Sequence, residues 1–207
     1  MITAPKNDEN HGESKSCAPR CSWAMTHADK PFYVDYHDTE WGVPVHDDRL
    51  FFEMLILEGA QAGLSWLTIL ARRDTYRAAF DNFDVHKVAA YDDAKQQALL
   101  ADPGIIRNKL KIAATIQNAK TFIAIQNEFG SFDAYIWQFV ENKPVFNHWK
   151  TMGDVPVSTE LSDRISKDLK KRGMKFVGTT IIYSFLQATG LVMDHTVECY
   201  RYPDLVK

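Results

Sequence analysis

The chain has few cysteines and no long apolar run, and both absences narrow what it can be. Its three cysteines are too few for a disulfide framework in 207 residues. Apolar patches such as Met54–Leu57 are far too short for a membrane span or for the core of a signal peptide. We therefore expect a cytoplasmic protein with no membrane partner, in which a cysteine is a metal ligand, a catalyst or a spare residue.

Convincing runs of alternating polar and apolar residues are also missing, so the sequence does not predict a sheet. Hydrophobic residues make up 45% and charged residues 25%, which is ordinary for a soluble protein with its own core. Residues 1–20 are polar and without periodicity, and we expect them to form a disordered tail. The prediction is an all-α protein with one domain over residues 21–207, made of two helical lobes.

Helix boundaries can be predicted from capping residues. Asp47, Ser65 and Asp84 each precede an apolar run and suit an N-cap, whereas Gly130 and Gly190 suit helix ends. Residues 142–157 contain proline, glycine and few periodic apolar residues, and they indicate a loop. The predicted helices begin after Asp47 and Asp84 and cover about 65–80, 106–128, 132–140, 162–172 and 179–189.

The charge distribution is uneven, although the net charge of −3 is a weak argument against a nucleic-acid partner. Residues 164–175 carry six basic side chains and one acid, and a second basic stretch covers residues 107–120. Such runs are most often solvated helix faces, but they also suit DNA phosphates. The charges alone leave both interpretations open.

Helices 162–172 and 179–189 are joined by a short turn that Gly173 and Gly178 bracket. Glycine lets backbone N–H groups approach a ligand closely, and N–H groups at a helix start suit a phosphate. Lys171 and Lys175 would add Coulomb attraction. The alternative is an ordinary helical hairpin with glycine caps.

Five large aromatic residues fall within 44 positions of the N-terminal third, and an acidic residue interrupts an apolar run in the same region. Several Trp and Tyr residues together suggest a pocket for a flat ligand, although core packing is the commoner fate of any one of them. Glu58 lies among small and apolar residues, where a buried carboxyl makes a site candidate and an exposed helix end is the alternative. The aromatic residues are Trp23, Tyr33, Tyr36, Trp41 and Trp66.

His195 and Cys199 are four residues apart, so on a helix they share a face and suit two ligands of one zinc ion. Cys21 and His37 are candidates for the other two ligands. His27, His46 and Cys17 have the same ligand chemistry and remain alternatives.

Taken together, these segments resemble the bacterial 3-methyladenine DNA glycosylase I family, a member of the helix-hairpin-helix glycosylase superfamily. The similarity runs from Cys21 to about Pro203. Residues 1–20 have no counterpart in it, and the stretch between Trp23 and Tyr33 is longer than the family pattern. The matching segments are residues 21–23, 33–38, 40–44, 57–66, 104–107, 169–173, 175–179 and 194–195.

The resemblance implies a fold, a ligand set and a pocket. It implies one structural zinc ion held by Cys21, His37, His195 and Cys199, which would join the N- and C-terminal segments. It implies a backbone grip on double-stranded alkylated DNA by the hairpin, at Lys171, Gly173, Lys175 and Gly178. It also implies a monomer and a base pocket formed by Trp23, Tyr33, Tyr36, Trp41, Glu58 and Trp66.

The mechanism expected from this resemblance is base flipping followed by hydrolysis of the N-glycosidic bond. Glu58 would bind the base edge, Tyr36 would position the base, Trp66 would stack on it, and water would attack the sugar. No lysine suggests itself as a Schiff-base nucleophile, so we expect base release without strand cleavage. Asp194 lies in the neighbourhood where many helix-hairpin-helix glycosylases carry a catalytic aspartate, but it is next to a proposed zinc ligand, and we do not assign it that role.

Two alternatives follow from the same residues. A non-enzymatic zinc protein would bind DNA through the hairpin and release no base. A cysteine-dependent enzyme would use Cys199, which requires a free and reactive thiolate.

Overall fold

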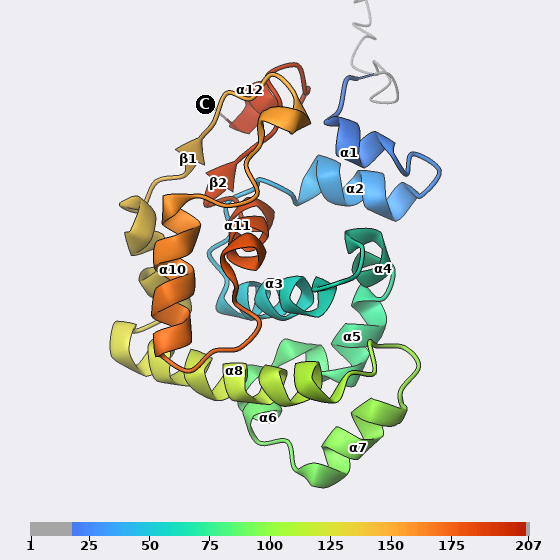
Figure 1. The fold of residues 1–207 in the computed structure, drawn as a ribbon, viewed down its shortest axis with the longest axis vertical. Helices are drawn as coiled ribbons and strands as arrows, with labels where there is room; N and C mark the ends of the chain where they lie inside the picture. Colours follow the sequence, from blue (N-terminus) through green and yellow to red (C-terminus); the bar gives the residue numbers. More distant parts are fainter. Residues whose placement is uncertain (1–17, 206–207) are drawn as a thin grey trace, which may run out of the picture.

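Helices make up nearly all of the regular secondary structure in this computed structural model, which describes residues 18–205 (Figure 1). The predicted all-α class is confirmed. Most of the predicted tail, including Cys17, lies outside the described residues. The helices are α1 (Ser22–Met25), α2 (Pro31–Thr39), α3 (Asp48–Gln61), α4 (Trp66–Leu70), α5 (Arg73–Ala79), α6 (Val85–Ala89), α7 (Asp93–Ala101), α8 (Lys109–Phe129), α9 (Phe132–Trp137), α10 (Glu160–Lys171), α11 (Thr179–Ala188) and α12 (Tyr202–Leu205).

The predicted N-caps are confirmed. The side chains of Asp47, Ser65 and Asp84 accept hydrogen bonds from backbone N–H groups in the first turns of α3, α4 and α6. Gly130 ends α8 at a φ of 89°, a conformation that glycine adopts without strain. These local signals succeed because each cap is settled within a few residues of chain.

Several predicted boundaries are wrong. The single helix expected over 65–80 is two helices, since the chain turns at Ala71 and Arg72 and thereby brings Arg73 to the buried carboxylate of Glu53, with Nε 2.5 Å from Oε1. α1, α2 and α7 were not predicted, although Pro31 at the first position of α2 is a usual start signal. The predicted loop 142–157 contains strand β1 (Val145–Phe146), which pairs in parallel with β2 (Val192–Met193).

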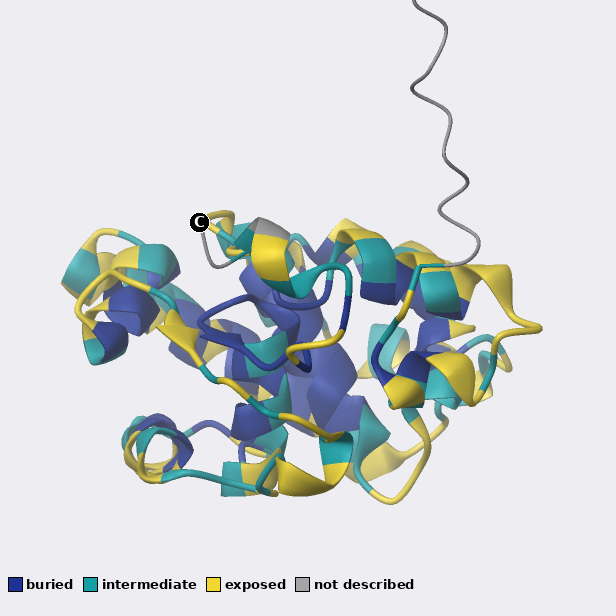
Figure 2. Ribbon diagram, turned by 90° about the horizontal axis from the view of Figure 1, so that it is seen from above, coloured by how far each residue is buried: buried dark blue, intermediate teal, exposed yellow. Residues whose placement is uncertain are grey.

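α3 runs through the middle of the molecule, and residues 51–60 of this helix are all buried (Figure 2). It contacts α4, α8, α9 and α11, and α10 packs against α11. The two ends of the described chain come together near α12: the Tyr200 N–H donates to the Pro19 carbonyl, and Arg20 forms an ion pair with Asp38 at 2.8 Å. Among residues 18–205, no helix is long and apolar enough to cross a membrane.

The α10–α11 hairpin is held in one conformation by its own backbone. Gly173 ends α10 at a φ of 104°. Its N–H donates to the Lys170 carbonyl and the Met174 N–H donates to the Leu169 carbonyl, which are the two bonds of a Schellman motif. The Asn118 side chain on α8 donates to the Lys175 carbonyl and accepts from the Lys175 N–H, at 2.9 and 2.8 Å. The turn is therefore anchored to the long helix behind it.

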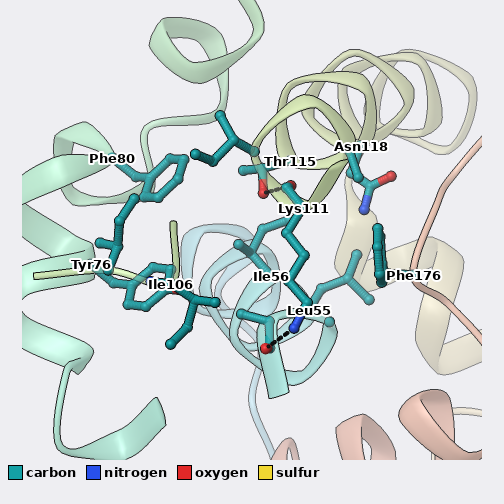
Figure 3. A pocket seen from close by; sticks show the side chains of 14 residues that line it. Leu55, Ile56, Tyr76, Phe80, Ile106, Lys111, Thr115, Asn118 and Phe176 are labelled. Carbon is teal, nitrogen blue, oxygen red and sulfur yellow. Dashed lines mark hydrogen bonds between the residues drawn. The ribbon is translucent and has the colours of Figure 1, made fainter. Parts of the chain in front are cut away.

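The same turn contacts the end of α3. A cavity of only about 20 Å³ lies between α3, α8 and Phe176, so it is a packing gap that holds at most one water-sized group (Figure 3). Across it, the Lys111 Nζ donates to the carbonyls of Ala60 and Ala62 at 2.7 and 2.8 Å. These bonds satisfy carbonyls at the C-terminal end of α3 and hold the helix against α8.

Two glycines at positive φ give a test of how closely the elements pack. A Cβ at Gly190 would lie 2.2 Å from the Val43 carbonyl carbon, whereas a Cβ at Gly130 would meet nothing within 4 Å. We expect Gly130→Ala to lower the free energy of unfolding by about 1–2 kcal/mol through backbone strain alone. Gly190→Ala should cost about 4 kcal/mol or more, because backbone must move as well. Urea denaturation of both variants would show equal losses if this packing were wrong.

Candidate active site and metal centre

A cavity of about 380 Å³ opens between α2, α3, α4 and α11. The five aromatic residues singled out in the sequence line it together, and so does Glu58. Sequence reasoning thus selected residues that the fold brings together from segments 43 positions apart. The remaining lining residues are Gln61, Met152, Val155, Pro156, Val157, Thr180, Tyr183, Ser184 and Gln187.

The aromatic side of the cavity is rigidly packed. Trp23 meets Tyr33 and Trp41 edge to face, with ring centroids 5.4 and 5.2 Å apart, and Tyr36 lies 5.4 Å from Trp66. Such contacts stabilise ring pairs beyond the area they bury. The indole nitrogens of Trp23 and Trp66 are both buried, and neither has a hydrogen-bond partner among the described residues. Two unmatched donors beside a cavity suit a ligand with acceptor atoms, because a buried donor without a partner costs free energy.

Glu58 lies near the C-terminal end of α3 and is 4% exposed, so the exposed-end alternative is wrong. None of the hydrogen bonds or ion pairs found among residues 18–205 involves its carboxyl group. Burial raises its pKa from 4.5 to about 8. Burial also raises the pKa of Tyr36 well above its ordinary value, with a further contribution from the negative charge of Glu58 nearby.

The wall opposite the aromatic rings was missed at the level of sequence. It is formed by Thr180, Tyr183, Ser184 and Gln187, four polar residues on one face of α11. Their spacing of three and four residues on an otherwise apolar helix is a signal that could have identified them. The segment at residues 152–157 completes the rim, where Val157 is largely exposed.

The four predicted metal ligands converge in a buried cluster, with their ligand atoms all within 4.8 Å of one another. The Cys199 Sγ lies 3.5 Å from the His37 Nε2 and 3.4 Å from the His195 Nδ1, and the Cys21 Sγ lies 3.5 Å from the same His195 nitrogen. A tetrahedral zinc ion with bonds of about 2.0–2.3 Å would separate its ligands by about 3.3–3.8 Å. The donor set and its spacing therefore fit a metal ion.

Each histidine of the cluster is oriented through its other nitrogen. The His37 Nδ1 lies 2.8 Å from an oxygen of Asp38, and the His195 Nε2 lies 2.9 Å from the Trp41 carbonyl oxygen. Such partners fix which nitrogen faces a metal. His46 instead pairs with Asp133 on the surface, and His27 packs against Tyr33, so neither belongs to the cluster.

The predicted DNA-contacting residues lie at and next to the turn of the α10–α11 hairpin, which contacts α8. Lys171 and Lys175 are exposed, and Gly178 precedes α11 without any side chain capping the first turn of that helix. Arg172, counted in the same basic stretch, is occupied by ion pairs with Asp168 and Glu128, both at 2.6 Å. The basic stretch consequently has fewer side chains available to bind DNA phosphates than its sequence suggests.

Comparison with known proteins decides the family. The family model described as methyladenine glycosylase matches residues 23–202. The chain belongs to the methyladenine glycosylase family. It is 49% identical over 184 residues to DNA-3-methyladenine glycosylase 1 of Escherichia coli (strain K12), a match that covers 89% of this chain and 97% of that protein.

Solved structures of the family share the fold. A crystal structure of 3-methyladenine DNA glycosylase I matches with a TM-score of 0.86 and 47% identity, covering 89% of this chain and all of the other. A second, of a variant with one tyrosine replaced by phenylalanine, was determined in complex with 3-methyladenine. It matches with a TM-score of 0.84 and 34% identity, over 87% of this chain and 96% of that one.

The raised pKa of Glu58 predicts a stability that falls as pH rises. The folded protein retains the carboxyl proton up to about pH 8, whereas the unfolded chain loses it near 4.5, so the folded state is progressively penalised between these values. Glu58→Gln removes the ionisable group. We expect it to match the parent protein at pH 5 and to be more stable by roughly 3–5 kcal/mol at pH 9.

Urea unfolding at pH 5, 7 and 9 measures this difference. Glu160→Gln is a suitable control, because the Glu160 side chain is exposed on α10 and its removal should give no such trend. If Glu58→Gln changed the free energy of unfolding by the same amount at all three pH values, the Glu58 carboxyl group would not be buried without a partner.

Proposed function

We propose that this protein is a monomeric DNA glycosylase that removes 3-methyladenine from double-stranded alkylated DNA by hydrolysing the N-glycosidic bond. The observation that carries the proposal is the cavity, in which five aromatic rings surround a buried carboxyl group without a partner. The family relationship and the relative solved with 3-methyladenine support it.

The cavity suits a flat cation. In DNA, 3-methyladenine carries positive charge, and ring faces attract such a base. A cation beside Glu58 would lower the pKa of this carboxyl again, because an opposite charge favours the ionised form. The carboxylate would then accept a hydrogen bond from the base edge, with Trp66 stacking on the base and Tyr36 positioning it. Trp23, Tyr33 and Trp41 would complete the base pocket.

The reaction needs little help with the leaving group, since a cationic base departs as a neutral molecule. Water attacks the sugar carbon as the glycosidic bond breaks, and the base leaves with the bonding electrons. No lysine lies among the cavity residues, so no Schiff base with the sugar is expected. The product would be an abasic site in an uncut strand.

The α10–α11 hairpin would hold the DNA backbone. The backbone N–H groups after Gly178 suit a phosphate, and Lys171 and Lys175 add positive charge. The turn at Gly173 is anchored to α8, and Phe176 packs on Gly59 beside Glu58. A helix-hairpin-helix grip on the backbone would thus set the distance from the phosphates to the base pocket.

We further propose that the buried cluster holds one structural zinc ion through Cys21, His37, His195 and Cys199. Two thiolates and two imidazoles are a usual donor set for zinc, and four protein ligands leave no position for a reactive water. When bound, the ion supplies a crosslink between α2 and the C-terminal segment.

The two alternatives are disfavoured by particular observations. A protein that only binds the DNA backbone has no use for an aromatic cavity with an unpartnered carboxyl. Cys199 is 1% exposed, lies in the metal cluster and does not line the cavity, so it is poorly placed as a nucleophile.

The purified protein should release 3-methyladenine from methylated duplex DNA. Glu58→Gln and Trp66→Ala together should lower the rate of release about 100-fold or more, since both contacts to the base are lost. Glu160→Gln on the exposed face of α10 should retain the parent rate. Chromatography of the released bases measures both. Absence of release by the parent protein would refute the function, and normal release by the double variant would refute the pocket assignment.

Metal analysis of the protein should find one zinc ion per chain. Cys199→Ser should lose the ion and several kcal/mol of stability, because metal binding contributes directly to folding. His46→Asn, which removes an exposed histidine outside the cluster, should keep the metal. A protein without zinc in which Cys21 and Cys199 react freely with thiol reagents would rule out the metal site.

A further inference from the structure

Asp194 is a buried carboxylate that the proposed mechanism does not use. It follows β2 directly and is 0% exposed. Four neutral donors surround it. Oδ1 accepts from the Asn147 Nδ2 and the Trp149 Nε1, both at 2.7 Å, and Oδ2 accepts from the Tyr183 Oη at 2.5 Å and the Gln187 Nε2 at 2.7 Å. With these contacts made, Asp194 has no oxygen free to activate a water molecule in the cavity.

The two oxygens of Asp194 face different parts of the molecule. Asn147 and Trp149 belong to the segment that pairs with β2, and neither lines the cavity. Tyr183 and Gln187 both line it, on the wall opposite the aromatic rings. Oδ1 thus binds two side chains outside the cavity, and Oδ2 binds two side chains of the cavity wall.

A carboxylate can only accept hydrogen bonds, and this property decides how its partners present themselves. Tyr183 must donate its single O–H to Asp194, so its oxygen can only accept further hydrogen bonds. Gln187 must turn its NH₂ toward Asp194, and its side-chain oxygen Oε1 takes part in none of the hydrogen bonds found among residues 18–205. Both side chains can then act toward a ligand as acceptors.

We propose that Asp194 is a positioning residue that makes this wall a row of acceptors and thereby selects a cationic base over a neutral one of the same shape. The acceptor wall, formed by Tyr183 and Gln187, complements positive charge in the cavity and favours N–H donors of the ligand. The inference rests on the proposed function for the identity of the natural ligand, but the polarity of the wall can be measured independently.

Asp194→Asn is a discriminating change. An asparagine oxygen in place of Oδ1 keeps the bonds from Asn147 and Trp149, while its NH₂ in place of Oδ2 donates to Tyr183 and Gln187. Tyr183 then turns its O–H away and Gln187 presents its NH₂, so the wall changes from acceptors to donors. Adding Gln187→Glu to this variant restores an acceptor wall, because a carboxylate at position 187 can accept from the asparagine and still offer an oxygen to the ligand.

The experiment measures binding of two isosteric probes by tryptophan fluorescence at pH 7.5: N-methylquinolinium, a cation, and 4-methylquinoline, which is neutral. The parent protein should prefer the cation. Asp194→Asn should lower the ratio of affinities about 10- to 100-fold, because the cation then faces the positive ends of N–H and O–H dipoles while the ring nitrogen of the neutral probe gains a donor. The variant that carries both Asp194→Asn and Gln187→Glu should recover most of the parent ratio of affinities. Asn147→Ala, which removes a donor from the other oxygen of Asp194, should keep the parent ratio.

Zinc content and the urea midpoint are measured for each variant, since Asp194 precedes a proposed metal ligand. Should Asp194→Asn fail to fold, Tyr183→Phe removes one acceptor and the hydrogen bond from Tyr183 but keeps the Asp194 carboxylate, and it should lose part of the preference. A folded Asp194→Asn protein with the parent ratio overturns the proposal, as does a double variant that recovers nothing. Release of 3-methyladenine by the parent protein tests the proposed function separately, so failure of one proposal is distinguishable from failure of the other.

Discussion

The convergence of four ligand side chains from the two ends of the chain is the constraint on which the cavity depends. Cys21 lies two residues before Trp23, and His195 lies directly after Asp194. The His195 ring packs against Trp41 with centroids 4.7 Å apart, and the His37 ring lies 5.3 Å from Trp23. A metal ion bound at this cluster would therefore hold the aromatic side of the cavity and the segment that carries Asp194 together.

Two buried carboxyl groups serve the same cavity in opposite ways. Glu58 has no hydrogen-bond or ion-pair partner among residues 18–205, so burial raises its pKa and leaves its oxygens for a ligand. Asp194 is surrounded by four donors and has nothing left to offer a ligand directly. The first carboxyl suits contact with substrate and the second suits control of neighbouring side chains. Residue type alone does not separate these roles, because they depend on how many donors the fold brings to each group.

The α10–α11 hairpin and the cavity are connected by contacts through α3 and α8. Asn118 fixes the backbone of Lys175 from both sides, and Phe176 packs against Gly59, the residue after Glu58. Lys111 binds the last carbonyls of α3. A phosphate held at the hairpin would thus lie in a defined position relative to the Glu58 carboxyl group. The contacts between the two places are made by backbone groups and by buried or half-buried side chains, which restrict their relative movement.

The sequence by itself determined the helical class, the capped helix starts, the family, the aromatic residues of the cavity and the four members of the metal cluster. The class and the helix starts follow from short-range signals, and Glu58 stands out because a carboxyl group is unusual in an apolar run. The family and the choice of all four cluster members follow from the resemblance between Cys21 and Pro203. Only the tertiary structure decided the break before Arg73, the ion pairs that occupy Arg172, the polar wall on α11 and the four donors around Asp194. Each of these depends on partners between 4 and 47 positions away, since Arg172 pairs with Asp168 as well as Glu128 and Asp194 bonds Asn147. The Arg172–Asp168 pair and the polar spacing on α11 have local signatures. The other contacts form only where folding places donor and acceptor within about 3 Å, and no local pattern encodes that placement.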